Sequence, residues 1–275
     1  MKKFLAISAL VLGVSLFATS PAQALIANDV ASNPAYSGGW GNGTNGGSGF
    51  LPWAITGNGN GTTLFTGNFT GNSAAGAGNI NTGGVSFGLY ANPVGAAINA
   101  NRAFATSLVS LDVFTFRLAL NYDNGNKGFD FFAGGDGTVL NFNVGGGAGV
   151  SSTKTLTPIT SVVYDYGGND AVFDVTLSMT SASSFSYDIS RTSSQGLQGT
   201  LFSGNVSGLT QGPTGFGFYV SGTDAGGADQ NNLYLNSLTV VPEPSALVLL
   251  GLGTIALGFR SLKNRRKGVS PKAVR

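Results

Sequence analysis

The feature that most constrains how this chain folds is a strict alternation of apolar and polar side chains in several short stretches. In residues 111–120, one apolar face is formed by Phe114, Phe116, Leu118 and Leu120. The same alternation recurs in 138–145, 171–179, 183–191, 215–222 and 232–241. A period of two residues turns one face toward a core and the other toward solvent, which is typical of antiparallel sheets. The pattern predicts an all-β fold, an antiparallel β-sandwich of about ten strands.

Glycine-rich connections separate these stretches. The chain has 44 Gly among 275 residues, and they are densest between Gly38 and Gly84. Asn-Gly pairs begin at Asn42, Asn45, Asn58, Asn60 and Asn124. This pair favours two-residue hairpin turns because both residues tolerate positive φ. Aromatic residues still recur in this region, so we expect short strands and tight turns, with partial disorder as the alternative. The one helix candidate, 94–108, is weakened by Gly95, and a pair of strands is the alternative there.

The first 24 residues have the pattern of a secretory signal peptide. Two lysines follow Met1, residues 4–18 are apolar, and Ala22 and Ala24 form a small-x-small cleavage pattern. We expect signal peptidase to cleave after Ala24, so that the body begins at residue 25. An uncleaved membrane anchor is the alternative.

The last 35 residues combine a Pro-Glu-Pro tripeptide, an apolar segment and a basic tail. Residues 245–259 carry no charge, and seven of the chain's 14 basic residues follow between 260 and 275. A helix of this length is about 22 Å long, shorter than the hydrocarbon core of about 30 Å. A transmembrane helix over 245–260 therefore needs its flanking cations to reach the interface, and the tail 260–275 should stay cytoplasmic. A buried core helix is the alternative.

In this order, the tripeptide, the apolar segment and the basic cluster resemble the PEP-CTERM sorting signal of exported proteins in Gram-negative bacteria. The resemblance implies recognition by exosortase, a membrane enzyme, and cleavage near the tripeptide after a stay in the inner membrane. The recognition residues that it implies are Pro242, Glu243, Pro244, Arg260, Arg265, Arg266 and Lys267. The residues after Lys267 extend past the usual basic end. The chain thus divides into a signal peptide (1–24), an extracellular body (25–240) and a sorting signal (241–275).

The body is acidic, although the whole chain has a formal charge of +2. Two of the 14 basic residues lie at the start and seven at the end, which leaves five in the body against 11 Asp, a formal charge of −6. The body therefore has no basic patch for a phosphate backbone, and nucleic acid is not an expected partner. With no Cys, the chain forms no disulfide and has no thiol chemistry.

The residue types also limit the catalytic chemistry. With no His and no Cys, the chain has no Ser-His-Asp triad, Cys nucleophile or His-rich zinc site. The only Glu is Glu243, in the sorting signal, so a glycosidase would need two Asp side chains. Most Asp residues lie near Gly- and Asn-rich turns, where Asp commonly shapes the turn. We therefore expect that the protein is not an enzyme.

Calcium is the metal that these residues fit best, because it accepts carboxylate, amide and carbonyl oxygens. The candidate ligands are Asp123, Asp130, Asp165 and Asp170, all beside turn sequences. None of them has the spacing of an EF-hand, and structural use in turns is the alternative. No other cofactor is expected.

Carbohydrate binding is a second candidate function. A shallow sugar site combines exposed aromatic rings with Asp and Asn, and the candidates are Trp40 and Trp53 with Asp224 and Asp229. The alternative is that both indoles pack in the core or at the rim of the sandwich.

A second resemblance concerns the body. The segments 78–92, 102–105, 113–120, 128–132 and 229–235 occur in an order similar to that of lectin- and laminin-G-like jelly rolls, which implies a concanavalin-like sandwich. The sequence thus predicts an exported surface or matrix protein with a structural or interaction role in the envelope or exopolysaccharide. Its processing partners would be signal peptidase and exosortase. The alternative is a carbohydrate-binding module, with or without calcium, whose partner is an extracellular polysaccharide.

Overall fold

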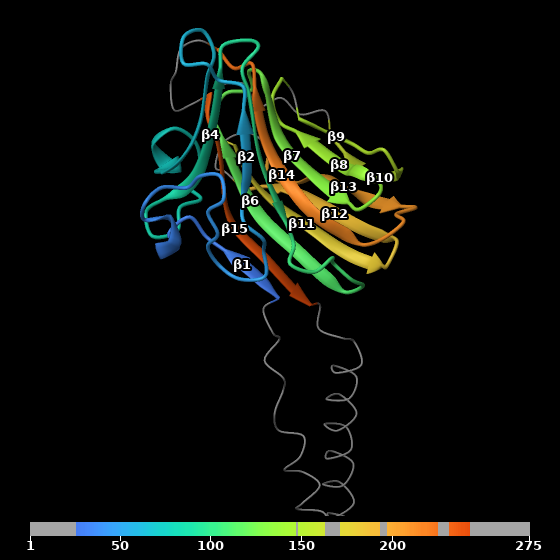
Figure 1. The fold of residues 1–275 in the computed structure, drawn as a ribbon. Coiled ribbons are helices and arrows are strands. Elements are labelled where there is room, and N and C mark those ends of the chain that lie inside the picture. The colour runs from blue at the N-terminus through green and yellow to red at the C-terminus, as the bar shows by residue number, and fades with distance from the viewer. Residues whose placement is uncertain (1–25, 147, 163–170, 193–196, 225–230, 243–275) are drawn as a thin grey trace, which may run out of the picture.

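Residues 26–146, 148–162, 171–192, 197–224 and 231–242 are described by the computed structural model, and in these ranges the chain forms two antiparallel sheets (Figure 1). The nine-stranded sheet has the order β10-β13-β12-β11-β6-β15-β4-β3, and β1 also pairs with β15. Its strands are β1 (Ala27–Asp29), β3 (Phe65–Gly71), β4 (Ser86–Asn92), β6 (Asp112–Leu120), β10 (Thr155–Ser161), β11 (Ala171–Ser181), β12 (Ser184–Arg191), β13 (Gly199–Ser207) and β15 (Leu233–Pro242).

The six-stranded sheet has the order β2-β5-β14-β7-β8-β9. Its strands are β2 (Ala54–Gly57), β5 (Ala97–Ala103), β7 (Asn126–Ala133), β8 (Gly137–Asn143), β9 (Gly149–Ser151) and β14 (Pro213–Ser221). Two single-turn 3-10 helices, η1 (Pro34–Tyr36) and η2 (Ser73–Ala75), lie in the connections. The chain repeatedly changes sheet, from β5 to β6 to β7 and again from β13 to β14 to β15. This back-and-forth course builds a jelly-roll-like β-sandwich, so the expected all-β antiparallel sandwich is confirmed.

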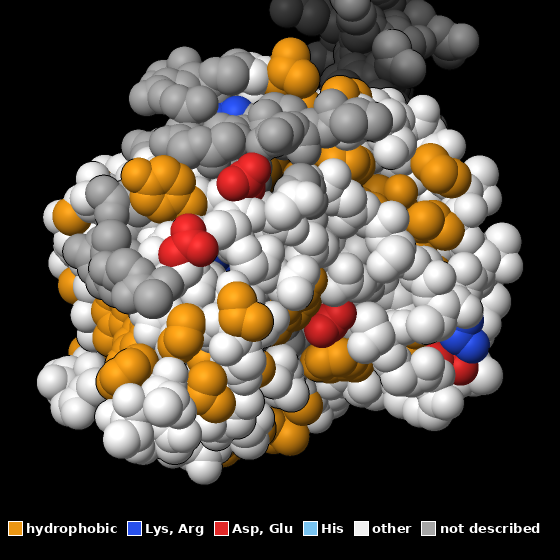
Figure 2. All heavy atoms as spheres, turned by 90° about the horizontal axis from the view of Figure 1, so that it is seen from above, with side chains coloured by type: hydrophobic (Ala, Val, Ile, Leu, Met, Phe, Trp, Pro, Cys, Tyr) orange, Lys and Arg blue, Asp and Glu red, His pale blue; other side chains and the backbone are white. Residues whose placement is uncertain are grey.

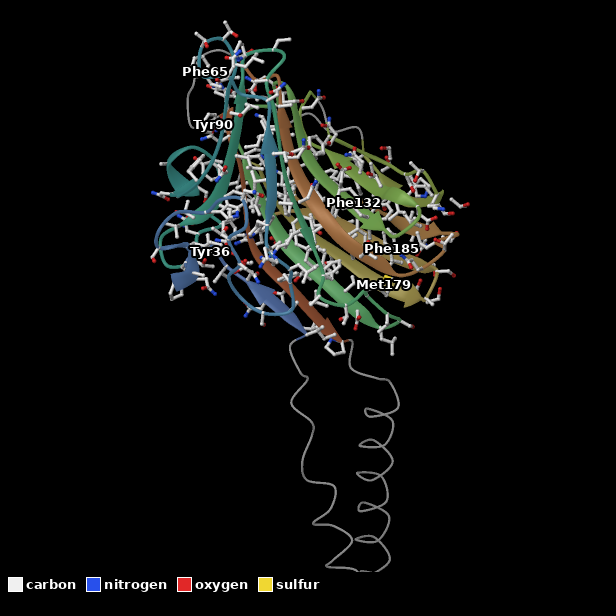
Figure 3. The ribbon with its side chains drawn as sticks, in the orientation of Figure 1. Tyr36, Phe65, Tyr90, Phe132, Met179 and Phe185 are labelled. Atoms are coloured by element: carbon white, nitrogen blue, oxygen red, sulfur yellow. The ribbon has the colours of Figure 1, made fainter. Side chains whose placement is uncertain are left out.

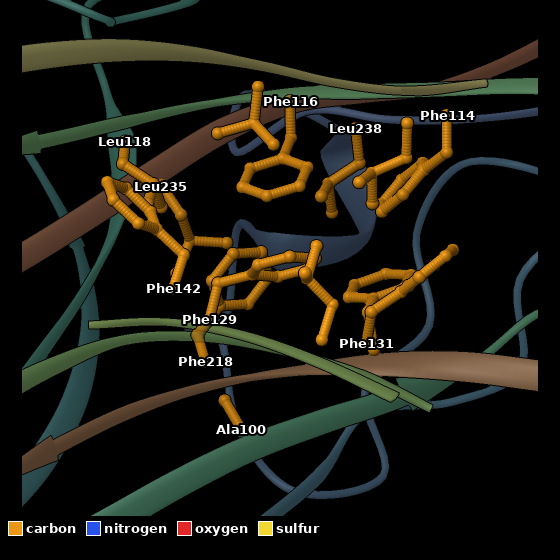
Figure 4. Packing of buried hydrophobic residues seen from close by; sticks show 14 of the residues in the cluster. Ala100, Phe114, Phe116, Leu118, Phe129, Phe131, Phe142, Phe218, Leu235 and Leu238 are labelled. Atoms are coloured by element: carbon orange, nitrogen blue, oxygen red, sulfur yellow. The ribbon is translucent and has the colours of Figure 1, made fainter. Parts of the chain in front are cut away.

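The core between the sheets is mainly aromatic (Figure 4). Phe114 of β6 lies 4.8 Å from Phe216 of β14, and Phe116 lies 4.6 Å from Phe129 of β7, measured between ring centroids. These four rings are at most 2% exposed. Phe114, Phe116 and Phe216 come from the apolar faces that the alternation predicted, so a period of two residues was enough to assign the inward side of β6 and β14.

The outer face of the nine-stranded sheet is partly covered as well. The segment that carries Ala77 and Ile80 packs on Val172 and Tyr234 in a second apolar cluster. Beside it, the buried Asn236 donates hydrogen bonds to the carbonyls of Ile80 (2.9 Å) and Val85 (3.1 Å), and its side-chain oxygen accepts one from the amide of Ala31 (3.0 Å). Tyr234 and Asn236, which should face solvent in β15, are therefore buried.

Of the five Asn-Gly pairs, only Asn42-Gly43 lies in a turn closed by a hydrogen bond, from the Thr44 amide to the Gly41 carbonyl (3.1 Å), and none of the five forms a hairpin between neighbouring strands. Gly61 and Gly125 have the expected positive φ (69° and 65°). Asn60-Gly61, however, lies between β2 and β3, and Asn124-Gly125 between β6 and β7, and each pair of flanking strands belongs to different sheets. The Asn-Gly pairs therefore do not decide strand pairing, because the partner of each strand depends on which sheet buries its apolar face.

The segment 94–108 forms no helix, and it contributes one strand, β5, where the alternative was a pair of strands. Helices of the described residues are all too short or too polar to cross a membrane. The two helices expected at the ends, in 1–24 and 245–260, lie outside the described residues.

Candidate functional site

The two ends of the body leave the sandwich side by side (Figure 1). β1 pairs antiparallel with β15, with Ala27 opposite Val240, and the amide of Ile26 donates to the Val240 carbonyl (3.0 Å). β1 begins three residues after Ala24, the expected cleavage point, and β15 ends at Pro242. Both expected processing points therefore adjoin one end of the folded body.

β15 is held firmly up to its last residue. Val240 is fully buried and lies opposite Phe114 of β6, and Pro242 lies opposite Asp112 at the start of the same strand. Pro242 is the one expected recognition residue that is described. The other residues expected at the processing points, which lie outside the described residues, are Ala22, Ala24, Glu243, Pro244, Arg260, Arg265, Arg266 and Lys267.

Trp40 and Trp53, the aromatic candidates for sugar stacking, lie in the core. They are 3% and 1% exposed, their ring centroids are 5.2 Å apart, and both pack on Phe87. The Trp53 ring nitrogen donates to the Tyr36 hydroxyl (3.2 Å). This corrects the sequence-based expectation, because a buried indole cannot present a face to a sugar at the surface. The alternative, that both indoles pack in the core, is confirmed.

A buried ion pair that sequence reasoning missed holds this region in place. Arg102 of β5 pairs with Asp29 of β1, and both side chains are fully buried. The guanidinium also donates to the carbonyls of Leu51 (2.8 Å) and Gly46 (2.8 Å) and to the Asn45 side chain (2.7 Å). It therefore fastens the Gly-rich segment between β1 and β2 onto the six-stranded sheet.

Two rings and a hydroxyl complete the surroundings of this pair. The Arg102 guanidinium lies over the rings of Phe50 (4.8 Å) and Trp53 (4.9 Å). The Tyr36 hydroxyl donates to Asp29 and accepts from the Gly46 amide (3.0 Å). Burial, together with the neighbouring Asp29 carboxylate, raises the pKa of Tyr36 to about 12. Every polar atom named here is paired, as a buried ion pair requires.

At the end of the sandwich opposite to Ala27 and Pro242, two candidate residues, Asp123 and Asp224, lie near the buried ammonium of Lys127. We call this the far end. Burial lowers the pKa of Lys127 to about 8, against the opposing charges of Asp123 and Asp224. The Lys127 ammonium donates to the Tyr122 carbonyl (2.5 Å), and the Asn124 amide donates to Asp224 (2.7 Å). A calcium candidate and a ligand candidate thus share one cluster, in which a lysine supplies positive charge.

Of the remaining candidate carboxylates, the structure describes Asp130 alone. Asp165, Asp170 and Asp229 lie outside the described residues. Within the ranges that the structure describes, no three His, Cys, Asp or Glu side chains lie close enough together to hold a metal ion. Figure 2, which looks onto the far end, shows scattered acidic and apolar side chains on a mostly uncharged surface.

Asp130, the last calcium candidate, belongs to a row of side chains on the outer face of the six-stranded sheet. The strand register places Asn101, Gly217, Asp130 and Asn141 side by side across β5, β14, β7 and β8. The Asn141 amide donates to Asp130 (3.0 Å) and to the Tyr219 hydroxyl (2.9 Å). We call these five residues the polar row.

Electrostatics in the polar row favour neutral partners. Burial raises the pKa of Asp130, and the hydrogen bond from Asn141 opposes the rise. Burial also raises the pKa of Tyr219 to about 12, so this hydroxyl stays protonated and can donate and accept. At Gly217 a Cβ would collide with the Asn101 side chain, so the glycine makes room for that side chain to lie over the middle of the row.

A groove of about 470 Å³ adjoins the polar row on the same sheet. Its walls include Leu51, Pro52, Asn101, Phe132 and Gly215. Leu51 is 48% exposed, and Phe132 lies over the six-stranded sheet (Figure 3). The face thus combines an apolar groove with a short run of amide and carboxylate groups. No sequence pattern indicates this arrangement, because its residues come from separate strands and meet only through their register.

Residues 240–266 match the PEP-CTERM protein-sorting motif. The chain carries a PEP-CTERM sorting motif. This motif implies an exported protein that an exosortase sorts and that its C-terminal tail anchors transiently in the membrane. The match begins at Val240, inside β15, so the sorting motif starts within the folded sheet.

Two solved structures have a distant likeness to the chain. One is the catalytic domain of beta-agarase D from Zobellia galactanivorans, at 8% identity over 71% of this chain and 76% of that one, with a TM-score of 0.34. The other is the catalytic domain of a GH87 alpha-1,3-glucanase, D1068A, in complex with tetrasaccharides, at 18% identity over 74% of this chain and 29% of that one, with a TM-score of 0.20. No curated protein sequence matches the chain. At these TM-scores, neither enzyme says what this protein does.

Proposed function

We propose that this protein is a non-catalytic component of the cell surface or the extracellular polymer, set free from the membrane by removal of both of its ends. The observation that carries the proposal is the pairing of β1 with β15, because it brings the first and last strands of the described body together beside the two expected processing points. Cleavage after Ala24 and near the tripeptide would remove no strand of the described body. The product is a stable module without a membrane segment.

The residue types support a binding or structural role over catalysis. Asp130 is the one carboxylate among the outward side chains of the six described strands of the smaller sheet. Acid-base cleavage of a glycosidic bond needs two carboxyl groups that flank the bond. The cation beside Asp123 and Asp224 is a lysine that is buried and committed to a backbone carbonyl. The body therefore fits a role in which it contacts a polymer without altering it.

The sorting step can be tested in the native host with the variant Glu243→Ala. We expect this variant to accumulate in the membrane fraction at full length, while the matched variant Ser245→Ala is processed as the parent protein is. Since Glu243 follows the last residue of β15 in the sequence, we expect the change to leave folding intact, which a protease-resistance assay would check. Normal processing and release of Glu243→Ala would contradict the proposal.

A second candidate function, carbohydrate binding, is favoured by the outer face of the six-stranded sheet. The polar row supplies amide, carboxylate and phenol groups that can bond to sugar hydroxyls in both directions. Phe132 and the groove beside it supply apolar surface for the ring faces. A neutral polysaccharide suits this site better than a charged one, because the body is acidic and the pKa of Asp130 is already raised by burial.

This second function can be tested on a glycan array with and without a calcium chelator. We expect binding of neutral glycans that falls at least about tenfold in Phe132→Ala and Asp130→Asn, as the loss of one stacked ring or one charged hydrogen bond implies. Phe65→Ala is the matched control, because Phe65 is 46% exposed on the other sheet. Absence of glycan binding in both conditions would rule out this function and leave the structural role. Binding that is lost only when the chelator is present would show that calcium takes part in glycan binding.

A further inference from the structure

No linker separates the folded body from the sorting motif. Pro242 is still paired with Asp112 in the nine-stranded sheet, and the match to the motif begins two residues earlier. The uncharged segment starts at Ser245, three residues beyond Pro242. Three residues span at most about 10 Å. When the tail is in the membrane, this end of the sandwich must therefore lie at the lipid surface.

The turn beside Pro242 exposes two apolar side chains. Asp112 begins β6, and in the turn before it Val109 is 61% exposed and Leu111 is 45% exposed. We call Val109 and Leu111 the apolar tip. Of the large apolar side chains that are exposed in the described residues, these two lie closest in sequence to Asp112, the partner of Pro242.

The backbone fixes the apolar tip in this exposed position. Leu111 has a φ of 74°, a left-handed conformation that residues other than glycine rarely adopt. The turn is closed by hydrogen bonds from the Asp112 amide to the Val109 carbonyl (3.0 Å) and from the Val109 amide to the Asp112 carboxylate (2.9 Å). The Leu111 amide donates to the Met179 carbonyl (2.9 Å), which ties the turn to β11. A strained leucine is thus maintained at the surface by a well-bonded turn.

We propose that the apolar tip docks on the bilayer that holds the C-terminal tail, with Val109 and Leu111 inserted at the level of the lipid headgroups. The inference rests on the transient membrane anchoring that the sorting motif implies. Since the body has a formal charge of −6, apolar insertion and not attraction to anionic lipid would orient it. Docking would fix the tripeptide at the membrane surface, where a membrane enzyme can reach it.

The chain offers a direct test because it has no Cys, so one introduced thiol gives one labelled site. The full chain is inserted into phosphatidylcholine vesicles after Val109→Cys is labelled with a polarity-sensitive fluorophore. We expect a blue-shifted emission and at least about twofold quenching by brominated lipid, as for a side chain in the headgroup region. The matched control is Val94→Cys, since Val94 is 83% exposed beyond β4, at the opposite end of β15 from Pro242.

The outcomes separate this inference from the anchoring on which it rests. If the chain floats with the vesicles but the probe at Val109 is as polar as the probe at Val94, docking is wrong and anchoring stands. If the chain does not float with the vesicles, both fail. A blue shift that appears only after exosortase is added to the vesicles would assign the apolar tip to the enzyme and overturn the lipid assignment. The variant Leu111→Asn, which suits the left-handed φ, should keep the fold and weaken the quenching.

Discussion

The sandwich buries Arg102 and Lys127 in very different surroundings. Arg102 is paired with Asp29, donates three further hydrogen bonds and lies against two aromatic rings. Lys127 is as deeply buried, but it donates to a carbonyl and has two carboxylates nearby, and its pKa is lowered to about 8. The first cation is paired with a carboxylate, whereas burial brings the pKa of the second close to physiological pH.

This difference shows how the fold uses its few charges. The guanidinium replaces nearly all of its hydration with fixed partners, so it can fasten a Gly-rich segment that has little propensity of its own. The ammonium at the far end lacks such a full set of partners, and burial there works against the charge. We therefore expect Arg102 to stabilise the native state strongly and Lys127 to destabilise it at neutral pH.

The largest effect is expected for Arg102→Met. This change leaves the Asp29 carboxylate buried and uncompensated, which should lower the free energy of unfolding by about 3–5 kcal/mol. Urea denaturation followed by tryptophan fluorescence would measure the loss, because Trp53 lies beside the pair. The double variant with Asp29→Asn should recover part of it. A loss below about 1 kcal/mol in the single variant would show that the pair is not the fastening described here.

Tyr36→Phe should have the next largest effect. The hydroxyl accepts hydrogen bonds from the Trp53 ring and the Gly46 amide, so its removal leaves two buried donors without a partner. The expected loss is about 2–3 kcal/mol, measured in the same urea titration. Tyr90→Phe, on β4 of the nine-stranded sheet, is the control. Equal losses in both variants would contradict the role assigned to Tyr36.

Because the pKa of Lys127 is lowered, we expect the free energy of unfolding to depend on pH, and Lys127→Met should abolish this dependence. Native Lys127 releases its proton near pH 8, while a lysine in the unfolded chain does so near 10.5. Between these values the unfolded state binds more protons, so the free energy of unfolding should rise by about 2 kcal/mol from pH 7 to 9.5. Subtracting the profile of Lys127→Met from that of the parent isolates this term from the tyrosines. If the profiles of the parent and of Lys127→Met are parallel, burial does not lower the pKa of Lys127.

The smallest effect is expected for Arg117→Gln. Arg117 pairs with Asp174 across β6 and β11 (2.7 Å), but the two side chains are 38% and 43% exposed. Exposed pairs contribute about 0–1 kcal/mol and weaken with salt. The loss in urea should be below about 1 kcal/mol and should disappear in 0.5 M salt, about where the Debye length falls to a few ångströms. A loss as large as that of Arg102→Met would remove the distinction between buried and exposed pairs drawn here.

The strands could be predicted from sequence wherever one face is buried and the other is wet. The stretches around Phe114, Phe173 and Phe218 alternate cleanly, and each forms a strand within two residues of the expected bounds. β1 and β9 were not predicted, because three residues are too few to show a period. Strand pairing was also beyond the sequence, since Asn-Gly specifies a turn and not the sheet that receives the next strand.

The sites were less accessible to sequence reasoning. The surroundings of Trp53 are rich in Gly and Asn, which suggests a surface loop, but Arg102 from a strand almost 50 residues away draws this segment into the core. The polar row likewise depends on the register of four strands. By contrast, the sorting motif is a linear signal, and the order of its three parts was sufficient to predict it.

The intact mass of the protein from cells and medium, with and without exosortase, tests the central claim most directly. The account predicts a mature form that begins at Leu25 and ends near the tripeptide 242–244 when exosortase is present, and a form that retains the tail when it is absent. Retention of the tail in both strains would contradict the account, because the C-terminal segment would then be a permanent membrane anchor.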